Sequence, residues 1–130
     1  MATTIAEYFT EELTDWRRTI TFYSSEVDNL TVRLDDVIRR NSIPDIATKV
    51  ENQQNKLNNV VSIFSRLLLI IQRQETALKT DNHFVDDTSI MAETEQQQKD
   101  LRQQIAQAEK EYMDTKNDCY KFLSELFKNS

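Results

Sequence analysis

The sequence of 130 residues contains no glycine and only one proline, Pro44. Average proteins contain about 7% glycine, which serves tight turns, strand bulges and loops that wrap phosphate groups. The nucleotide-binding motifs GxxxxGK[ST] and GxGxxG are impossible without it. Long helices need no glycine, and the abundant charged residues and glutamines favour helices. The composition therefore predicts an all-α protein.

Histidine and cysteine are nearly as scarce, with one of each in the chain. Ferritin-like metal sites need Glu-x-x-His on two helices, but Thr80 stands three residues before His83. A catalytic thiol needs a positive, accessible setting and usually a histidine, whereas Cys119 lies far from His83 in the chain. We expect Cys119 to be buried and inert. The sequence thus predicts no catalytic, cofactor-binding or metal-binding residue, and we expect that the protein is not an enzyme.

Basic residues are too few to balance the acidic ones, and the 16 Lys and Arg against 22 Asp and Glu give a net charge of −6. Nucleic-acid binding and docking on anionic lipid both depend on excess Lys and Arg, so neither is expected. The first residues, MATTIAEYFTEE, lack the basic and apolar regions of a secretory signal. Together with the single cysteine, they predict a cytoplasmic protein.

Long apolar runs are also missing, because the most apolar stretch, VVSIFSRLLLII at Val60–Ile71, is shorter than the ~20 residues of a membrane span. On a helical projection its apolar arc is roughly 180° wide, against the ~100° of an ordinary surface helix. We therefore interpret it as the central part of a core helix. Such a helix has to be covered on more than one side.

Apolar residues recur in alternating steps of three and four along most of the chain, which is the heptad pattern of packed helices. In the first segment this pattern begins after a capping box formed by Thr4 and Glu7. Pro44 interrupts it, and the polar stretch TDNHFVDD at residues 80–87 interrupts it again. We predict helices at residues 5–40, 44–79 and 87–128, joined by short connections. They make a single domain, residues 1–130, folded as an up-down-up three-helix antiparallel bundle.

Two glutamines, Gln53 and Gln74, occupy heptad positions of the second helix. A polar residue there can specify the register between helices, at some cost in stability. We favour the alternative that both lie in loosely packed layers near the helix ends.

The wide apolar face of the segment Val60–Ile71 predicts an interface with another chain. A hairpin centred near Asn82 places the segment 67–71 opposite the polar segment 93–100. That leaves Ile63, Leu69 and Ile70 without an intrachain partner, and exposed apolar patches often mark association sites. We predict that another protein covers them, either a second copy in a homodimer or a helix-presenting partner. The alternative is that the third helix starts elsewhere and covers them itself.

The first helix carries a further pattern, formed by Glu11-Glu12, Trp16, Phe22-Tyr23, Glu26, Leu30 and Arg33-Leu34. This pattern resembles small uncharacterised helical-bundle proteins of Bacteroidetes-type bacteria. The resemblance implies a helical bundle and implies no activity.

The function expected from these observations is that of a non-enzymatic helical-bundle scaffold or interaction module that self-associates. The alternative is a membrane-surface or secretion-associated helical protein. It would use either the apolar run of the second helix or the amphipathic C-terminal segment KFLSELFKNS.

Overall fold

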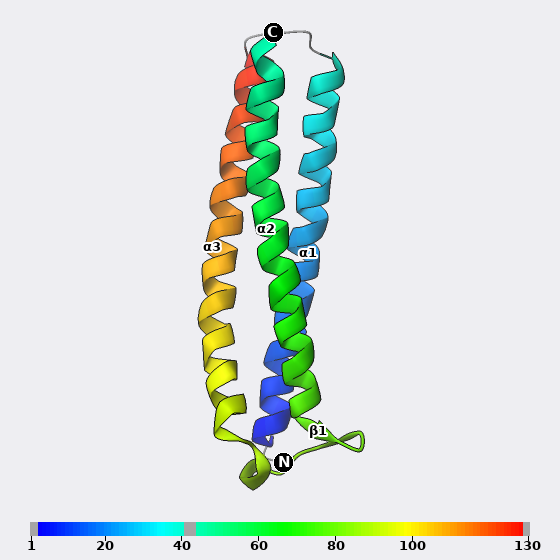
Figure 1. The fold of residues 1–130 in the computed structure, drawn as a ribbon, viewed down its shortest axis with the longest axis vertical. Helices are drawn as coiled ribbons and strands as arrows, with labels where there is room; N and C mark the ends of the chain where they lie inside the picture. The colour runs from blue at the N-terminus through cyan, green and yellow to red at the C-terminus, as the bar shows by residue number, and fades with distance from the viewer. Residues whose placement is uncertain (1–2, 41–43, 129–130) are drawn as a thin grey trace.

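The computed structural model describes residues 3–40 and 44–128. Three long helices, α1 (Ile5–Arg40), α2 (Pro44–Ala77) and α3 (Ala92–Lys128), lie side by side along one axis (Figure 1). Helices α1 and α3 run in the same direction, and α2 runs against both. The predicted all-α fold and the up-down-up three-helix bundle are confirmed.

The ends of the helices follow the capping residues of the sequence. The Thr4 hydroxyl oxygen accepts a hydrogen bond of 3.2 Å from the backbone N–H of Glu7, as the capping box predicts. Pro44 is the first residue of α2, where its fixed backbone angle suits a helical first turn. The residues between α1 and α2 lie outside the described part of the chain.

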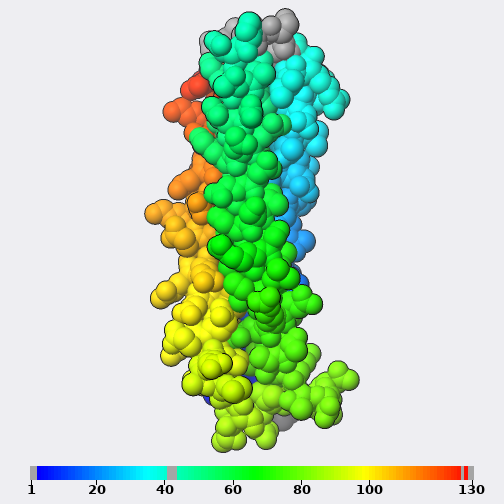
Figure 2. Space-filling model, viewed as in Figure 1, coloured from blue at the N-terminus to red at the C-terminus, as the bar shows by residue number. Residues whose placement is uncertain are grey.

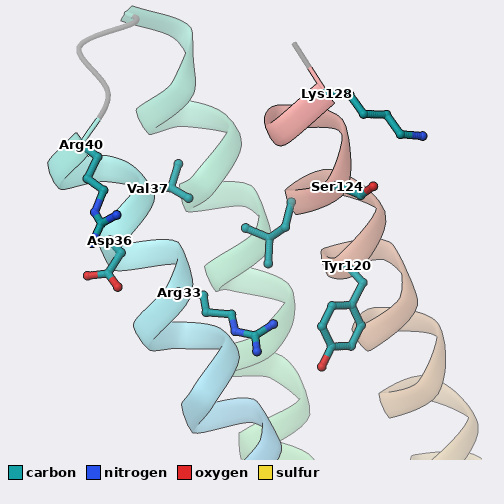
Figure 3. A pocket seen from close by; sticks show the side chains of 8 residues that line it. Arg33, Asp36, Val37, Arg40, Tyr120, Ser124 and Lys128 are labelled. Carbon is teal, nitrogen blue, oxygen red and sulfur yellow. The ribbon is translucent and has the colours of Figure 1, made fainter. Parts of the chain in front are cut away.

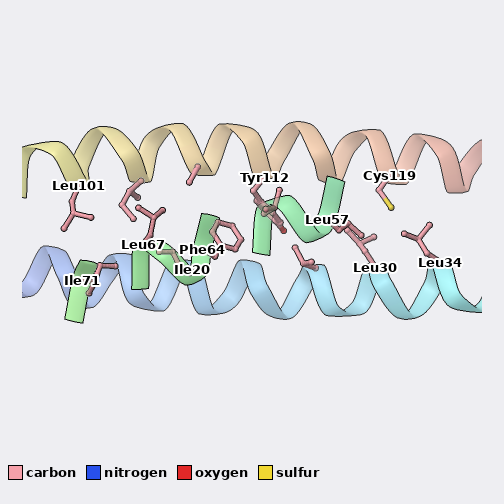
Figure 4. Close-up of a cluster of buried hydrophobic side chains, with 14 of the residues drawn as sticks. Ile20, Leu30, Leu34, Leu57, Phe64, Leu67, Ile71, Leu101, Tyr112 and Cys119 are labelled. Carbon is pink, nitrogen blue, oxygen red and sulfur yellow. The ribbon is translucent and has the colours of Figure 1, made fainter. Parts of the chain in front are cut away.

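The core runs the length of the bundle and consists mainly of the predicted heptad positions (Figure 4). At its middle, Tyr112 stacks on Tyr23 with 4.2 Å between the ring centroids, and Phe64 approaches the same ring at 6.0 Å. These three aromatic residues come from α3, α1 and α2, so one layer of side chains ties the three helices together. Cys119 is fully buried in the same core, as predicted.

The connection between α2 and α3 differs from the prediction. Helix α2 ends at Ala77, two residues early, and a small antiparallel hairpin of β1 (Lys79–Thr80) and β2 (His83–Phe84) follows. Its turn residues Asp81 and Asn82 have φ angles of 51° and 66°. Aspartate and asparagine tolerate this left-handed conformation, so a tight hairpin turn forms here without glycine. The hairpin projects from one end of the rod-shaped molecule (Figures 1 and 2).

Helix α3 begins at Ala92 rather than near Asp87, which is a further correction. Residues Asp87–Ser89 form a single 3-10 turn, η1, and Ile90 is extended. The Asp87 side chain accepts a hydrogen bond of 2.9 Å from the backbone N–H of Ile5. The residues after the hairpin therefore cap the start of α1 instead of continuing a helix.

The longer connection changes the register between α2 and α3. Gln74 hydrogen-bonds to Gln98, so the hairpin of helices is centred near residue 86 and not near Asn82. Leu67 consequently lies beside Gln104 and Ala108. The predicted placement of segment 67–71 opposite the polar segment 93–100 is wrong, because the prediction made the connection too short.

Gln74 itself also departs from the prediction of a loosely packed end layer. It is buried, and its amide nitrogen donates to the Thr94 carbonyl at 2.6 Å and to the Gln98 side chain at 3.0 Å. Gln53 is buried as well and donates to Asp118 at 3.1 Å. Gln74 sits in a packed, hydrogen-bonded layer, as residues that specify register do, whereas the amide oxygen of Gln53 is buried without a hydrogen-bond partner among the described residues.

Candidate functional site

The three residues of the predicted interface occupy two different faces of α2. Ile63 and Ile70 are half-buried and pack against the core, whereas Leu69 is 55% exposed. Ile63 and Ile70 are seven residues apart and share a face, but Leu69 is turned about 100° from Ile70. The structure therefore leaves Leu69 as the accessible member of the set.

Helix α3 covers the flank on which Ile63 lies. Ile63, Arg66 and Leu67 border a shallow hollow whose other side is formed by α3 residues from Gln103 to Glu111. The register shift explains this cover, because it brings residues of the middle of α3, and not the start of α3, beside Ile63. Polar glutamine side chains of α3 supply much of the far rim of this hollow.

A second surface lies between the two parallel helices. Ion pairs cross from α1 to α3 at two levels: Arg102 donates to Glu12 at 2.7 and 2.8 Å, and Lys116 donates to Glu26 at 3.1 Å. The Tyr112 hydroxyl also donates to Glu26. Between and beyond these pairs, residues of both helices line three hollows. We call this surface the α1/α3 groove.

Exposed aromatic and apolar side chains follow the α1/α3 groove on both sides. On α1, Tyr8 and Phe22 are 53% and 59% exposed, and on α3 Met113 and Tyr120 are exposed as well. Tyr8 and Phe22 are two heptads apart with exposed Asp15 at the position between them, and Met113 and Tyr120 are one heptad apart, so each pair lies on one side of its helix. Phe22 stands four residues before Glu26, which contacts α3. Each stripe therefore faces the groove or its edge.

Three of these side chains belong to the hollows themselves. Tyr8 lines the hollow at the start of α1, Met113 lines the middle one beside Trp16, and Tyr120 lines the hollow at the far end. The far hollow has a volume of about 690 Å³. It falls in the size range of about 300–1,000 Å³ that is typical of ligand sites.

This far hollow, which we call the basic hollow, has an apolar floor and a charged rim. Its lining residues are Arg33, Asp36, Val37, Arg40, Tyr120, Leu123, Ser124 and Lys128. Val37 and Leu123 are buried and form the floor. Arg33 and Tyr120 point toward one another across the space between α1 and α3, and the guanidinium carbon lies 5.9 Å from the ring centroid (Figure 3). The rim carries three cationic side chains and one anionic side chain.

The titratable groups in the middle of the groove are held in their usual charge states. The hydrogen bond from Tyr112 and that from Lys116 lower the pKa of Glu26. Burial and the hydrogen bond to Glu26 raise the pKa of Tyr112. A general acid or base needs a pKa near the working pH. Glu26 and Tyr112 are shifted away from neutral pH, so the pair is a structural contact between α1 and α3.

Residues that could carry other chemistry are dispersed. Among residues 3–40 and 44–128, no three His, Cys, Asp or Glu side chains are grouped so that they could hold a metal ion. His83 is exposed on the hairpin. Burial raises the pKa of the Cys119 thiol, which disfavours the reactive thiolate.

No protein-family model, curated protein or solved structure matches this chain. The resemblance of the first helix to bacterial helical-bundle proteins therefore stays a prediction. Within the described ranges, none of the helices contains an apolar stretch long enough to span a membrane.

The α1/α3 groove was not predicted from the sequence, although part of its signal is visible there. Tyr8, Phe22, Met113 and Tyr120 repeat at multiples of seven, outside the main heptad positions. The pattern does not say which other helix lies beside them. That information came only from the packing of α1 against α3.

Proposed function

We propose that this protein is a non-enzymatic interaction module that binds a helix of another protein chain in the α1/α3 groove. The observation that carries the proposal is the pair of exposed aromatic and apolar stripes along a groove with three hollows. Exposed apolar residues at heptad spacing on two neighbouring helices can pack against an additional helix, as in a four-helix bundle.

The energetics of side-chain burial support a helix as the occupant. Phe22, Tyr120 and Tyr8 are bulky side chains that are about half exposed. Fully burying a large apolar side chain contributes roughly 1.5–3 kcal/mol, so covering three half-exposed ones contributes several kcal/mol before the cost of association. The hollows between the stripes would accept the side chains of the incoming helix, as the holes of a coiled coil accept knobs.

A display library of amphipathic helices of about 20 residues, long enough for nearly three heptads, tests this proposal. Helices selected by the full chain would be titrated into isotope-labelled protein and mapped by NMR. We expect amide shifts along α1 and α3. We also expect binding to be lost in the Phe22→Ser/Tyr120→Ser variant and retained in Leu69→Ser. Selection of no helix, or shifts confined to the outer face of α2, would contradict the proposal.

Self-association through α2 is a second proposal, and it is supported by the exposure of Leu69, while exposed Val61 lies about 80° away around the helix. We expect a dimer by sedimentation at micromolar concentration. We also expect a folded monomer for Leu69→Glu, with Phe22→Ser as the control that remains dimeric. Glutamate at Ile63 or Ile70 would be a poorer test, because both residues pack against the core and their replacement costs stability. A wild-type protein that stays monomeric at high concentration rules out this dimer.

A further inference from the structure

The charge of the basic hollow differs in sign from that of the whole protein. Arg33 reaches into it, Arg40 and Lys128 stand at its rim, and Asp36 is the one acidic side chain in its lining (Figure 3). The chain as a whole carries a net charge of −6. The four ion pairs found among the described residues involve other side chains, so these three cations are not neutralised by them. A concentration of positive charge on an acidic protein favours an anionic group there.

The floor of the basic hollow adds a requirement for an apolar contact. Val37 and Leu123 close its base, and the half-exposed ring of Tyr120 forms one wall under the Arg33 guanidinium. An occupant that carried only charge would leave the half-exposed ring of Tyr120 in water. The site therefore suits a group in which an apolar side chain is flanked by carboxylates.

We propose that the basic hollow selects an acidic amphipathic helix of a protein partner. One apolar side chain of that helix lies over Val37 and Leu123, and its carboxylates contact Arg33, Arg40 and Lys128. This inference rests on the proposed function, since it specifies the chemistry of the helix that the α1/α3 groove receives. Carboxylates spaced three or four residues apart on one helix lie on the same face, so one helix can supply several of them.

One observation favours a different protein over a second copy of this chain, and another favours a helix over a small anionic molecule. Two copies each carry a net charge of −6 and repel at long range. The basic hollow also continues into the exposed stripe of Met113 and Tyr120, which extends away from it along α3. A helix can follow that stripe, whereas a small anionic molecule would occupy the hollow alone.

The test uses two synthetic helical peptides that share leucines at the heptad positions. One carries glutamates at the remaining exposed positions, and the other carries lysines there. Binding of the full-length chain to each labelled peptide would be measured by fluorescence anisotropy. We expect the glutamate peptide to bind at least about tenfold more tightly. We also expect its affinity to fall with added salt, because salt screens exposed charges.

Matched charge-reversal variants locate the site. Arg33→Glu/Arg40→Glu should weaken binding of the glutamate peptide about tenfold, which corresponds to about 1.4 kcal/mol. Arg18→Glu/Arg73→Glu changes the net charge of the protein equally at two exposed residues outside the hollow. We expect this control pair to leave the affinity within about twofold, because distant exposed charges are largely screened. Circular dichroism would verify that both variants remain helical.

Several outcomes would overturn the inference. Equal affinity for the two peptides would show that the hollow has no preference for an acidic helix. Equal weakening by the two variant pairs would show that the peptide does not bind at Arg33 and Arg40. Binding to phosphatidylserine–phosphatidylcholine vesicles that depends on Arg33 and Arg40, without peptide binding, would assign the hollow to a membrane surface instead. If library-selected helices bind in the groove but neither designed peptide does, the acidic preference fails while the proposed function stands.

Discussion

Gln98 is the side chain through which all three helices are hydrogen-bonded to one another. Its amide oxygen accepts from Gln74 of α2 at 3.0 Å, and its amide nitrogen donates to the Phe9 carbonyl at 3.1 Å and to Glu12 at 3.2 Å on α1. The residue is 0% exposed. Replacing Gln98 by alanine should therefore destabilise the whole bundle.

The magnitude follows from the bonds that are lost. Each intramolecular hydrogen bond contributes a net 0.5–1.5 kcal/mol, and bonds to charged groups contribute somewhat more. Gln98→Ala removes three bonds, one of them to the Glu12 carboxylate, and leaves a small cavity. We expect the free energy of unfolding to fall by roughly 2–4 kcal/mol. Gln74 keeps its bond to Thr94, and Glu12 keeps Arg102, so neither partner loses every contact.

Urea unfolding followed by circular dichroism measures this loss. Gln96→Ala on the same helix is the control, because Gln96 is exposed and bonded only to Asp100 among the contacts seen, at 3.0 Å. We expect this control to cost no more than about 0.5 kcal/mol. The double substitution Gln74→Leu/Gln98→Leu should recover part of the loss, since it replaces both amides of the Gln74–Gln98 bond by apolar groups. The recovery is partial because the Phe9 and Thr94 carbonyls and Glu12 each lose a donor.

The predicted role of Gln98 is wrong if Gln98→Ala lowers the free energy of unfolding no more than Gln96→Ala does. That result would mean that the buried amides contribute nothing net to stability. If the double leucine variant is stable but adopts more than one oligomeric state, Gln74 and Gln98 act mainly on specificity of packing.

Two further predictions concern titratable groups. The Tyr112 and Lys116 hydrogen bonds lower the pKa of Glu26 from 4.5, so ionised Glu26 stabilises the fold fully above about pH 4.5 and loses this effect as the pH falls through the lowered pKa. The urea midpoint should therefore fall less steeply between pH 5 and pH 3 for Glu26→Gln than for the wild type, and identical slopes would contradict this. Cys119 should react with a thiol reagent far more slowly in the native protein than in denaturant, because it is fully buried and its pKa is raised. Equal rates would show that the site opens freely.

Much of the fold could be predicted from local properties of the sequence. The heptad spacing and the missing glycine predict three helices, and the bounds at Ile5, Arg40 and Pro44 agree with the structure. These features depend on interactions between residues three or four apart, which is why a sequence pattern is enough to find them. The burial of Cys119 followed from the same periodicity.

The connection between α2 and α3 was beyond this kind of reasoning. Asp81 and Asn82 can adopt positive φ, but nothing nearby in the sequence says that they do so here. Once the hairpin and the 3-10 turn lengthen the connection, every facing pair between α2 and α3 shifts. The flank of Ile63 is then covered by α3. Of the three residues predicted to form the interface, Leu69 is the one that stays accessible to another chain.

The sequence by itself determined which residues form helices and which stripe of each helix is apolar, because both are periodic and local. Only the tertiary structure decided the register of α2 against α3 and the meeting of α1 with α3. Both depend on how connecting segments fold and on which flank of each helix its neighbours leave uncovered. The basic hollow exists for that reason: Arg33 and Tyr120 are far apart in the chain and face each other only because two parallel helices pack side by side.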